Sequence, residues 1–406
     1  MDKERTAEDI IAQHQQYVMP TYAPSLTLVK GEGAYVWDVE GNRYLDFCSG
    51  IAVTNIGHCH PRLVRAIQEQ ASTLMHVSNL YYNEQQPKLA AALVEAAGLS
   101  GAKCFFCNSG AEANEGMIKL ARLWGSATGR HEIITMKQSF HGRTLATLTA
   151  TGQDKVKGGF APLPNGFVYA DYNDFSSVEA LVHEQTVAIM VESIQGEGGV
   201  IPATSDFLQQ LRNLCDEKNL LLLCDEVQAG VGRTGAWFGF QHSGIEPDAF
   251  SLAKGLGGGF PIGALVAGKR VADTFQPGHH ATTFGGTPLA AAAALAVMDT
   301  IKEEALLAQA TERGNQFLSG LAKIAEKHAD WMCGARGIGL MCGLVLKESA
   351  APLQAKLMEK GLLSIATAGH VLRMLPPMVV TPEHIDEALD WIAQAADELE
   401  SEAGKK

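Results

Sequence analysis

Residues 187–226 read VAIMVESIQGEGGVIPATSDFLQQLRNLCDEKNLLLLCDE, and this stretch decides the fold. The apolar runs at 187–191 and 220–224 have the length and unbroken hydrophobicity of strands that are buried on both faces. Between them, residues 205–218 carry apolar side chains at helical spacing. A strand, a helix and a second strand in this order are typical of parallel strands joined by a crossover helix.

The same alternation continues toward the N-terminus of this stretch. Apolar residues recur at helical spacing in PRLVRAIQEQASTL (61–74), in PKLAAALVEAA (87–97) and over 111–124. Short apolar runs typical of strands occur at KCFFC (103–107) and EIITM (132–136). We therefore predict an α/β fold, with a mainly parallel sheet covered by helices on both faces.

From about residue 286 the pattern changes to long helices, then short strands around GLMCGLVL (339–346) and HVLRMLP (370–376), then a terminal helix. This order predicts a smaller α+β domain at the C-terminal end. The N-terminal stretch AYVWDVEGNRYLDF (34–47) resembles a hairpin and is expected to join the small domain. The predicted division is an N-terminal segment at 1–60, a large α/β domain at 61–290 and the small α+β domain at 291–406.

Composition limits the class of partner. The 406 residues contain 45 acidic and 32 basic side chains, a net charge of −13, which argues against nucleic acid or an anionic membrane as a partner. The chain contains no apolar stretch approaching the ~20 residues of a membrane span. The charged N-terminus does not resemble a signal peptide, so the eight cysteines are expected to be reduced thiols of a cytoplasmic protein.

We expect no metal site. Cys104 and Cys107 have a metal-like spacing, but they lie in a strand-like run, where alternation sends the two thiols to opposite faces. The HCH sequence at 58–60 has no second group of ligands at regular spacing and is expected to be a loop before a helix.

Chemical groups follow the predicted strands, and ligands of open α/β sheets bind beyond the carboxyl ends of the strands. Asp225 follows the run at 220–224, and Lys254 follows DAFSL (248–252). Glycines at 255 and 257–259 come directly after this lysine, which indicates close approach of a ligand or another chain to the backbone.

Three more strand ends contribute groups. After 103–107, Ser109 and Glu112 form the pattern of a capping box, and Gly110 would let an anion approach the free N–H groups of the helix start. After the run at 132–136 come an aromatic residue and its basic neighbours, Phe140, His141 and Arg143. After the run at 187–191 come polar residues among glycines, Glu192, Gln195 and Glu197.

A lysine, a carboxylate, an aromatic ring and a phosphate-compatible helix start together favour pyridoxal-phosphate chemistry. A lysine amine becomes a nucleophile by forming a Schiff base with a carbonyl, and a pyridoxal ring needs an acidic partner at its nitrogen and a phosphate cradle. A Walker-type phosphate lysine is disfavoured, because in that motif the glycines precede the lysine. The alternative from another class is an NAD-dependent dehydrogenase built on GVGRTG (230–235), but this match begins five residues after its strand and does not lead into a helix.

At this point the chain resembles a known family. The blocks that carry the resemblance to the class III (ornithine-type) pyridoxal-phosphate aminotransferases are CNSGAEANEGMIKLAR, FHGRT, QGEGGV, CDEVQAGVGRTG, SLAKGLGGGFPIGA and TTFGGTPLA. The similarity runs from about YVMPTYAP to LRMLPPMVVT, nearly the whole chain. It implies the fold of type I pyridoxal-phosphate transferases, with a large domain and a small domain.

The resemblance implies a role for individual residues. Lys254 is the Schiff-base lysine, and Asp225 is the partner of the pyridine nitrogen. The backbones of Gly110 and Ala111 are implied to donate to the phosphate, and Phe140 and Val227 to pack on the two faces of the ring. Gln228 is implied to lie near the ring hydroxyl. Thr283 is implied to reach the phosphate of a neighbouring subunit. The last of these implies a homodimer with shared active sites.

The family resemblance also implies how two substrates share one site. Arg373 is expected to bind the α-carboxylate of glutamate, and Glu197 is expected to pair with Arg373 when glutamate is absent. Arg143, assisted by Thr282, is expected to hold the distal carboxylate. The implied reaction moves the δ-amino group of N-acetylornithine to 2-oxoglutarate, as a step of arginine biosynthesis.

Other amino donors stay open as alternatives: succinylornithine, ornithine, 4-aminobutyrate and succinyldiaminopimelate. Three residues depart from the family pattern, and they bear on the substrate rather than on the cofactor. Ser193 stands where proline is usual, and Phe284 and Thr287 stand where tyrosine and asparagine are common.

Overall fold

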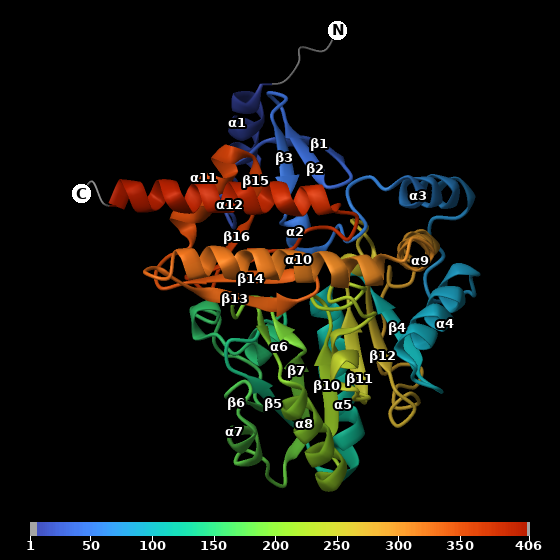
Figure 1. Ribbon diagram of the computed structural model, residues 1–406. Coiled ribbons are helices and arrows are strands. Elements are labelled where there is room, and N and C mark those ends of the chain that lie inside the picture. The colour runs from blue at the N-terminus through green and yellow to red at the C-terminus, as the bar shows by residue number, and fades with distance from the viewer. Residues whose placement is uncertain (1–5, 404–406) are drawn as a thin grey trace.

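A seven-stranded sheet forms the centre of the computed structural model, which describes residues 6–403 (Figure 1). The strand order is β4-β12-β11-β10-β7-β5-β6, and all neighbours are parallel except β12, which runs antiparallel to β11 and β4. The predicted mainly parallel sheet is therefore confirmed. Its strands are β4 (Lys103–Cys107), β5 (Glu132–Met136), β6 (Phe167–Ala170), β7 (Thr186–Glu192), β10 (Leu221–Asp225), β11 (Ala249–Leu252) and β12 (Gly263–Ala267).

Helices cover both faces of this sheet, as predicted. In β10, Leu222 and Cys224 belong to the apolar cluster that contains α8 (Ser205–Lys218), whereas Leu221 and Leu223 belong to the cluster that contains α5 (Gly110–Gly125). Alternate side chains of a strand point to opposite faces, so the continuous run LLLLC is buried on both sides. The other helices of this part of the chain are α3 (Pro61–Thr73), α4 (Gln85–Ala97), α6 (Leu145–Ala150) and α7 (Phe175–Glu179).

The first and last parts of the chain meet above this sheet (Figure 1). The predicted hairpin is formed by β2 (Tyr35–Asp38) and β3 (Arg43–Asp46), and β3 also pairs with β15 (Leu362–Leu363) from the C-terminal part. The remaining strands are β1 (Leu28–Glu32), which pairs with β2, the short pair β8 (Ile194–Gln195) and β9 (Ile201–Pro202), and the sheet β13 (Met332–Ile338), β14 (Met341–Leu346), β17 (Val371–Met374) and β16 (Ile365–Thr367).

Four helices belong to the C-terminal part of the described chain. They are α9 (Pro288–Glu303), α10 (Leu306–Lys327), α11 (Ala351–Lys360) and α12 (Pro382–Ala403), preceded near the N-terminus by α1 (Ala7–Tyr17) and the short turn α2 (Ser49–Ala52). The helices α9 and α10 are separate because Ala305 adopts a left-handed conformation with φ of 52°. No helix within residues 6–403 combines the length and the apolar character that crossing a bilayer requires.

The two cysteines of β4 lie in different surroundings, as the strand alternation predicts. The Cys104 thiol faces the carbonyl of Ala90 on α4, whereas the Cys107 thiol faces the carbonyl of Ser109. Burial raises the pKa of each thiol to about 12. A thiol with a raised pKa has little of the nucleophilic thiolate form at neutral pH.

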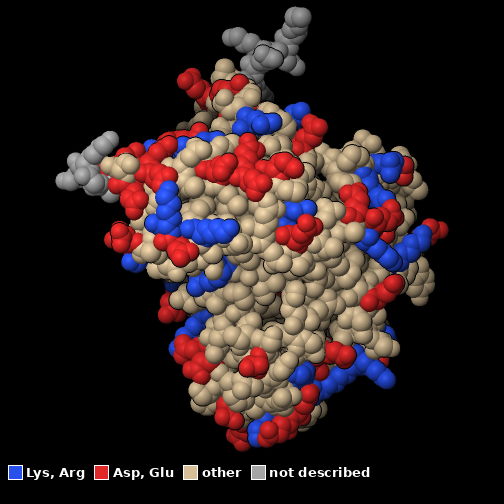
Figure 2. All heavy atoms as spheres, viewed as in Figure 1, with Lys and Arg blue, Asp and Glu red and all other residues tan. Residues whose placement is uncertain are grey.

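Charge is unevenly distributed over the face of the molecule seen in Figure 2. Acidic and basic side chains gather toward the two ends of this face, and a band of uncharged residues crosses between them at the level where the C-terminal part meets the large sheet. On this face, the junction of the two parts is thus poor in charged side chains.

Candidate active site

A cavity of about 430 Å³ opens at the carboxyl ends of the parallel strands. Residues that follow five strands line it, as the strand-end argument predicts. They include Gly110 after β4, Phe140 after β5, Glu192 at the end of β7, Asp225 at the end of β10 and Lys254 after β11.

Lys254 begins a short 3₁₀ turn directly after β11 and has a left-handed backbone, with φ of 48°. Strained backbone of this kind occurs preferentially at functional sites. Burial lowers the pKa of Lys254, and the nearby Arg373 lowers it further, while Glu197 and Asp225 oppose the shift. A lower pKa increases the fraction of neutral amine, which is the nucleophilic form.

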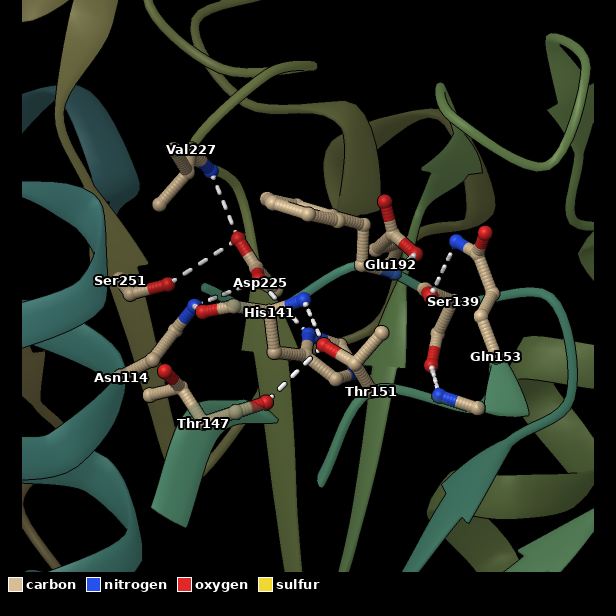
Figure 3. Close-up of polar contacts among 12 residues, drawn as sticks. Asn114, Ser139, His141, Thr147, Thr151, Gln153, Glu192, Asp225, Val227 and Ser251 are labelled. Atoms are coloured by element: carbon tan, nitrogen blue, oxygen red, sulfur yellow. Dashed lines mark hydrogen bonds and ion pairs between the residues drawn. The ribbon is translucent and has the colours of Figure 1, made fainter. Parts of the chain in front are cut away.

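Asp225 is buried at the base of the cavity, and four donors hold its two oxygens (Figure 3). Asn114 Nδ2 donates to Oδ2 at 2.7 Å, and His141 Nδ1 lies 2.8 Å from the same oxygen. The backbone N–H of Val227 donates to Oδ1 at 3.0 Å, and the hydroxyl of Ser251 does so at 3.3 Å. This carboxylate is therefore fixed in orientation by hydrogen bonds to both of its oxygens.

The start of α5 forms a second side of the cavity. Ser109 is the N-cap, and its hydroxyl accepts a hydrogen bond from the backbone of Glu112 at 3.2 Å. The expected capping box is displaced by one residue, because the Glu112 carboxylate accepts from the N–H of Asn108 and not from that of Ser109. Gly110 and Ala111 are the first residues of this helix and line the cavity, where their N–H groups have no intrahelical acceptor.

Gly110 must be a glycine for a steric reason. A Cβ atom at this position would lie 2.7 Å from Cγ1 of Val227, which also lines the cavity. Phe140 lines the cavity from the loop after β5, and its N–H donates to Oε2 of Glu192 at 3.1 Å. An amine, a fixed carboxylate, an aromatic ring and a helix start that accepts anions fit a phosphorylated aromatic aldehyde such as pyridoxal phosphate.

Arg373, Glu197 and Gln228 form a connected group beside the cavity. Arg373 on β17 is 1% exposed, and its Nη1 donates to Glu197 Oε1 at 2.6 Å and to Gln228 Oε1 at 3.0 Å. Burial alone would raise the pKa of Glu197, but the guanidinium of Arg373 lowers it below the usual value. Of these three residues, Gln228 lines the cavity itself.

Of the remaining predicted residues, Arg143 lines the cavity, whereas Thr282 and Thr283 do not. Arg143 lines the cavity, is exposed, and its guanidinium lies 5.4 Å from the ring centre of Phe140. Thr282 lies on the loop before α9, where its hydroxyl accepts from the backbone of Gly285 at 3.2 Å, and Thr283 beside it is exposed. These two threonines lie outside the cavity lining of this chain.

Sequence reasoning assigned no role to several side chains of this site. Asn114 and Ser251 act on Asp225 from α5 and β11, and their only sequence signal is a polar residue within an apolar face. Glu192 pairs in register with Asp225 across β7 and β10. Burial and the neighbouring Asp225 raise the pKa of Glu192 well above its usual value.

Ser193, the departure from the family pattern, has a local partner. Its hydroxyl donates to Oε1 of Glu226, a fully buried carboxyl that also accepts from the N–H groups of Gly239 at 2.6 Å and Phe240 at 3.0 Å. Burial raises the pKa of Glu226 from 4.5 to about 7, although these three donors lower it.

This shift predicts a pH-dependent stability. An acid with a raised folded-state pKa stabilises the protein fully below pH 4.5, and this contribution is lost as the pH rises toward 7. Glu226→Gln does not titrate and keeps a carbonyl oxygen as acceptor. We expect the unfolding free energy of Glu226→Gln, relative to the unsubstituted protein, to rise by about 3 kcal/mol between these pH values. Denaturant unfolding at pH 5 and pH 8 measures this, with the exposed Glu217→Gln as control. Parallel curves would contradict the expectation.

Comparison with known proteins agrees with the cofactor that the geometry of the cavity fits. The sequence profile of the family described as "Aminotransferase class-III" matches residues 17–396. An acetylornithine aminotransferase of Gloeobacter violaceus is 53% identical, with 92% of this chain and 94% of that protein covered. An acetylornithine aminotransferase of Caldanaerobacter subterraneus subsp. tengcongensis is 50% identical, with 96% and 100% covered.

Solved structures show the same likeness in three dimensions. The ornithine aminotransferase of Toxoplasma gondii ME49 superposes with a TM-score of 0.94 at 34% identity, covering 98% of this chain and 96% of that chain. The acetylornithine aminotransferase of Elizabethkingia anophelis has a TM-score of 0.86 at 33% identity, covering 97% and 100%.

Proposed function

Because the chain belongs to the class III aminotransferases, a family that uses pyridoxal phosphate, we propose that it moves the δ-amino group of N2-acetyl-L-ornithine to 2-oxoglutarate. The products are N-acetylglutamate 5-semialdehyde and glutamate. Relatives with 44% to 53% identity over nearly the whole chain are named acetylornithine aminotransferases, which supports the choice of donor. We place the reaction in arginine biosynthesis and in the cytoplasm, where free thiols such as the eight of this chain stay reduced.

The cofactor contacts are proposed as follows. When bound, pyridoxal phosphate supplies the carbonyl carbon that receives the amino group and a ring that accepts the electron pair left by a departing proton. The N–H groups of Gly110 and Ala111 hold the phosphate, and Phe140 and Val227 enclose the ring. Asp225, held by its four donors, keeps a proton on the ring nitrogen.

Lys254 has the central role in the proposed chemistry. With pyridoxal phosphate bound, the amine of Lys254 would hold the cofactor, and as a free amine it would accept a proton from one carbon atom as general base and donate it to another as general acid. The lowered pKa of Lys254 suits this role, because the amine must be neutral to accept the proton.

The observation that carries the two-substrate proposal is the ion pair of Glu197 with the buried Arg373. With glutamate, the α-carboxylate replaces Glu197 on Arg373. With N-acetylornithine, which reacts through its far end, no carboxylate arrives there, and Glu197 keeps the buried guanidinium neutralised. The distal carboxylate of that substrate is then held by Arg143, assisted by Thr282.

A panel of amines tests this function. Half-reactions of the purified enzyme with N-acetylornithine, succinylornithine, ornithine, 4-aminobutyrate and succinyldiaminopimelate are followed at the absorbance of the cofactor. We expect N-acetylornithine to have the highest kcat/KM of the panel. A higher value for any other amine would replace the proposed donor, and a purified protein without visible absorbance would overturn the cofactor assignment.

Glu197→Gln should change the balance of the two half-reactions. A neutral glutamine leaves the guanidinium of Arg373 unpaired during the N-acetylornithine half-reaction, whereas the α-carboxylate of glutamate still pairs with it. We expect the ratio of kcat/KM for glutamate to that for N-acetylornithine to rise about 10-fold or more. The exposed Glu84→Gln, whose partner is Lys88, serves as control. An unchanged ratio would remove Glu197 from this role.

We also propose a homodimer with shared active sites. Large apolar side chains are exposed on two neighbouring segments: Met75, Leu80, Tyr81 and Tyr82 on one, and Phe284 on the other. Exposed apolar side chains gathered in this way are typical of protein interfaces. Thr283 lies beside Phe284, so the partner subunit's Thr283 would reach the phosphate of the facing site. Sedimentation of the active enzyme tests this, and a fully active monomer would contradict it.

A further inference from the structure

Arg233 and Arg373 are the largest fully buried side chains within residues 6–403, and Arg233 has an exposed fraction of 0%. It lies in GVGRTG, the stretch that sequence alone made a weak candidate for a dinucleotide loop. Burial lowers the pKa of its guanidinium to about 10. Burying a cation costs several kcal/mol unless its surroundings compensate, so this position calls for a physical reason.

The acceptors of Arg233 are all uncharged, and they come from three distant segments. Its Nη1 donates to the carbonyl of Leu340, in the turn between β13 and β14, at 3.2 Å and also to the carbonyl of Pro376. Its Nη2 donates to Oδ1 of Asn55 at 2.6 Å. The backbone carbonyl of Arg233 accepts from the N–H of Leu340 at 3.0 Å. One side chain thus joins the N-terminal segment and two C-terminal segments to the large domain.

Asn55 connects this joint to the catalytic lysine. Its Nδ2 donates to the backbone carbonyl of Val231 at 2.8 Å, and its own backbone carbonyl accepts from the N–H of Met378 at 2.7 Å. A Cβ atom at position 255 would lie only 2.1 Å from Nδ2 of Asn55. The residue after Lys254 is therefore a glycine because the amide of Asn55 occupies the space of a side chain there.

The contacts of Arg233 are also connected to Arg373 through two segments of the chain. Arg373 is near the end of β17, and Pro376, which accepts from Arg233, lies three residues further along the chain. Gln228, which accepts from Arg373, precedes Arg233 by five residues. Figure 1 shows β13 and β14 lying directly over the ends of the strands of the large sheet. The position of Arg373 relative to Lys254 thus depends on contacts that converge on Arg233.

We propose that Arg233 is a positioning residue for the glutamate half-reaction, which sets the distance and orientation of Arg373 relative to Lys254. The inference rests on the proposed function, in which only glutamate places a carboxylate on Arg373. N-acetylornithine places its carboxylate at Arg143, which lies against the ring of Phe140 in the loop after β5. A displaced Arg373 should therefore impair one half-reaction more than the other.

Arg233→Lys tests the inference, because one ammonium keeps the charge but cannot reproduce the planar, forked donor geometry toward three acceptors. We expect KM for glutamate to rise and kcat/KM for glutamate to fall about tenfold or more, with a change of about threefold or less for N-acetylornithine. Asn55→Ala, which removes one acceptor and leaves Arg233 in place, should shift the same ratio in the same direction. Arg212→Lys is the matched control, since Arg212 on α8 pairs with Asp216 of the same helix and with Asp248, the residue before β11.

Cofactor absorbance counts the intact sites in each variant, so loss of folded enzyme is separated from a change per site. Equal losses in both half-reactions would overturn the inference and assign Arg233 a purely structural role. Unchanged kinetics in both variants would overturn it as well. If the unsubstituted enzyme fails to react with N-acetylornithine, the proposed donor is wrong, and the ratio is then measured against whichever ω-amine of the panel reacts.

Discussion

Lys254→Ala is expected to lower kcat by at least about 10³-fold while the protein still folds and takes up pyridoxal phosphate. The substitution removes the amine that carries the proton between carbon atoms, and no other lysine lines the described cavity. Cofactor uptake should persist, because the helix start at Gly110 and the fixed carboxylate of Asp225 are untouched. Steady-state turnover with N-acetylornithine and 2-oxoglutarate measures the loss.

The matched control for this substitution is Lys88→Ala. Lys88 is a solvent-exposed residue of α4 that pairs with Glu84, so its removal tests whether loss of any lysine affects the assay. We expect its turnover to equal that of the unsubstituted enzyme. Turnover of Lys254→Ala within about tenfold of normal would show that another group moves the proton.

Asp225→Asn should cause the second largest loss, a fall in kcat of about 10²- to 10³-fold. The amide keeps the shape of the carboxylate but removes the charge that holds a proton on the ring nitrogen. Its NH₂ group would also face a donor, either Asn114 Nδ2 with His141 Nδ1 on one side or the N–H of Val227 on the other. A buried donor without an acceptor costs about 1–3 kcal/mol, so weaker cofactor binding should accompany the slower turnover.

The control for this prediction is Asp171→Asn, which removes a carboxylate of an exposed ion pair with Lys137. Its turnover and its affinity for the cofactor should be unchanged. If Asp225→Asn retained turnover within about threefold of normal, the charge at this position would be unnecessary for the reaction.

The sequence predicts the parts of the site that lie at strand ends. Lys254, Asp225 and Phe140 each follow an apolar run, and the carboxyl ends of parallel strands meet at one edge of a sheet. The strands and their direction are therefore enough to predict that these residues lie together. Apolar spacing predicts the helix at 205–218, and in the structure this helix begins after Thr204 as N-cap and ends before Asn219, a left-handed C-cap.

The rest of the site depends on contacts between residues far apart in the chain. Asn114 bonds to Asp225 across 111 positions, and Arg233 bonds to Asn55 across 178 positions, so no local pattern announces either contact. The raised pKa of Glu192 results from burial beside Asp225, which composition does not reveal. Thr283 lies outside the cavity of its own chain, so its predicted role depends on a second subunit.

The central claim is that this cavity exchanges an amino group between N-acetylornithine and 2-oxoglutarate through a bound cofactor and Lys254. The most direct measurement mixes the purified holoenzyme with N-acetylornithine alone and follows visible absorbance, then adds 2-oxoglutarate after the amine has been removed. We predict that the visible band of the bound cofactor falls with the first addition and returns with the second, with one glutamate formed per site. A band that does not change with N-acetylornithine, or that does not return with 2-oxoglutarate, would contradict the claim.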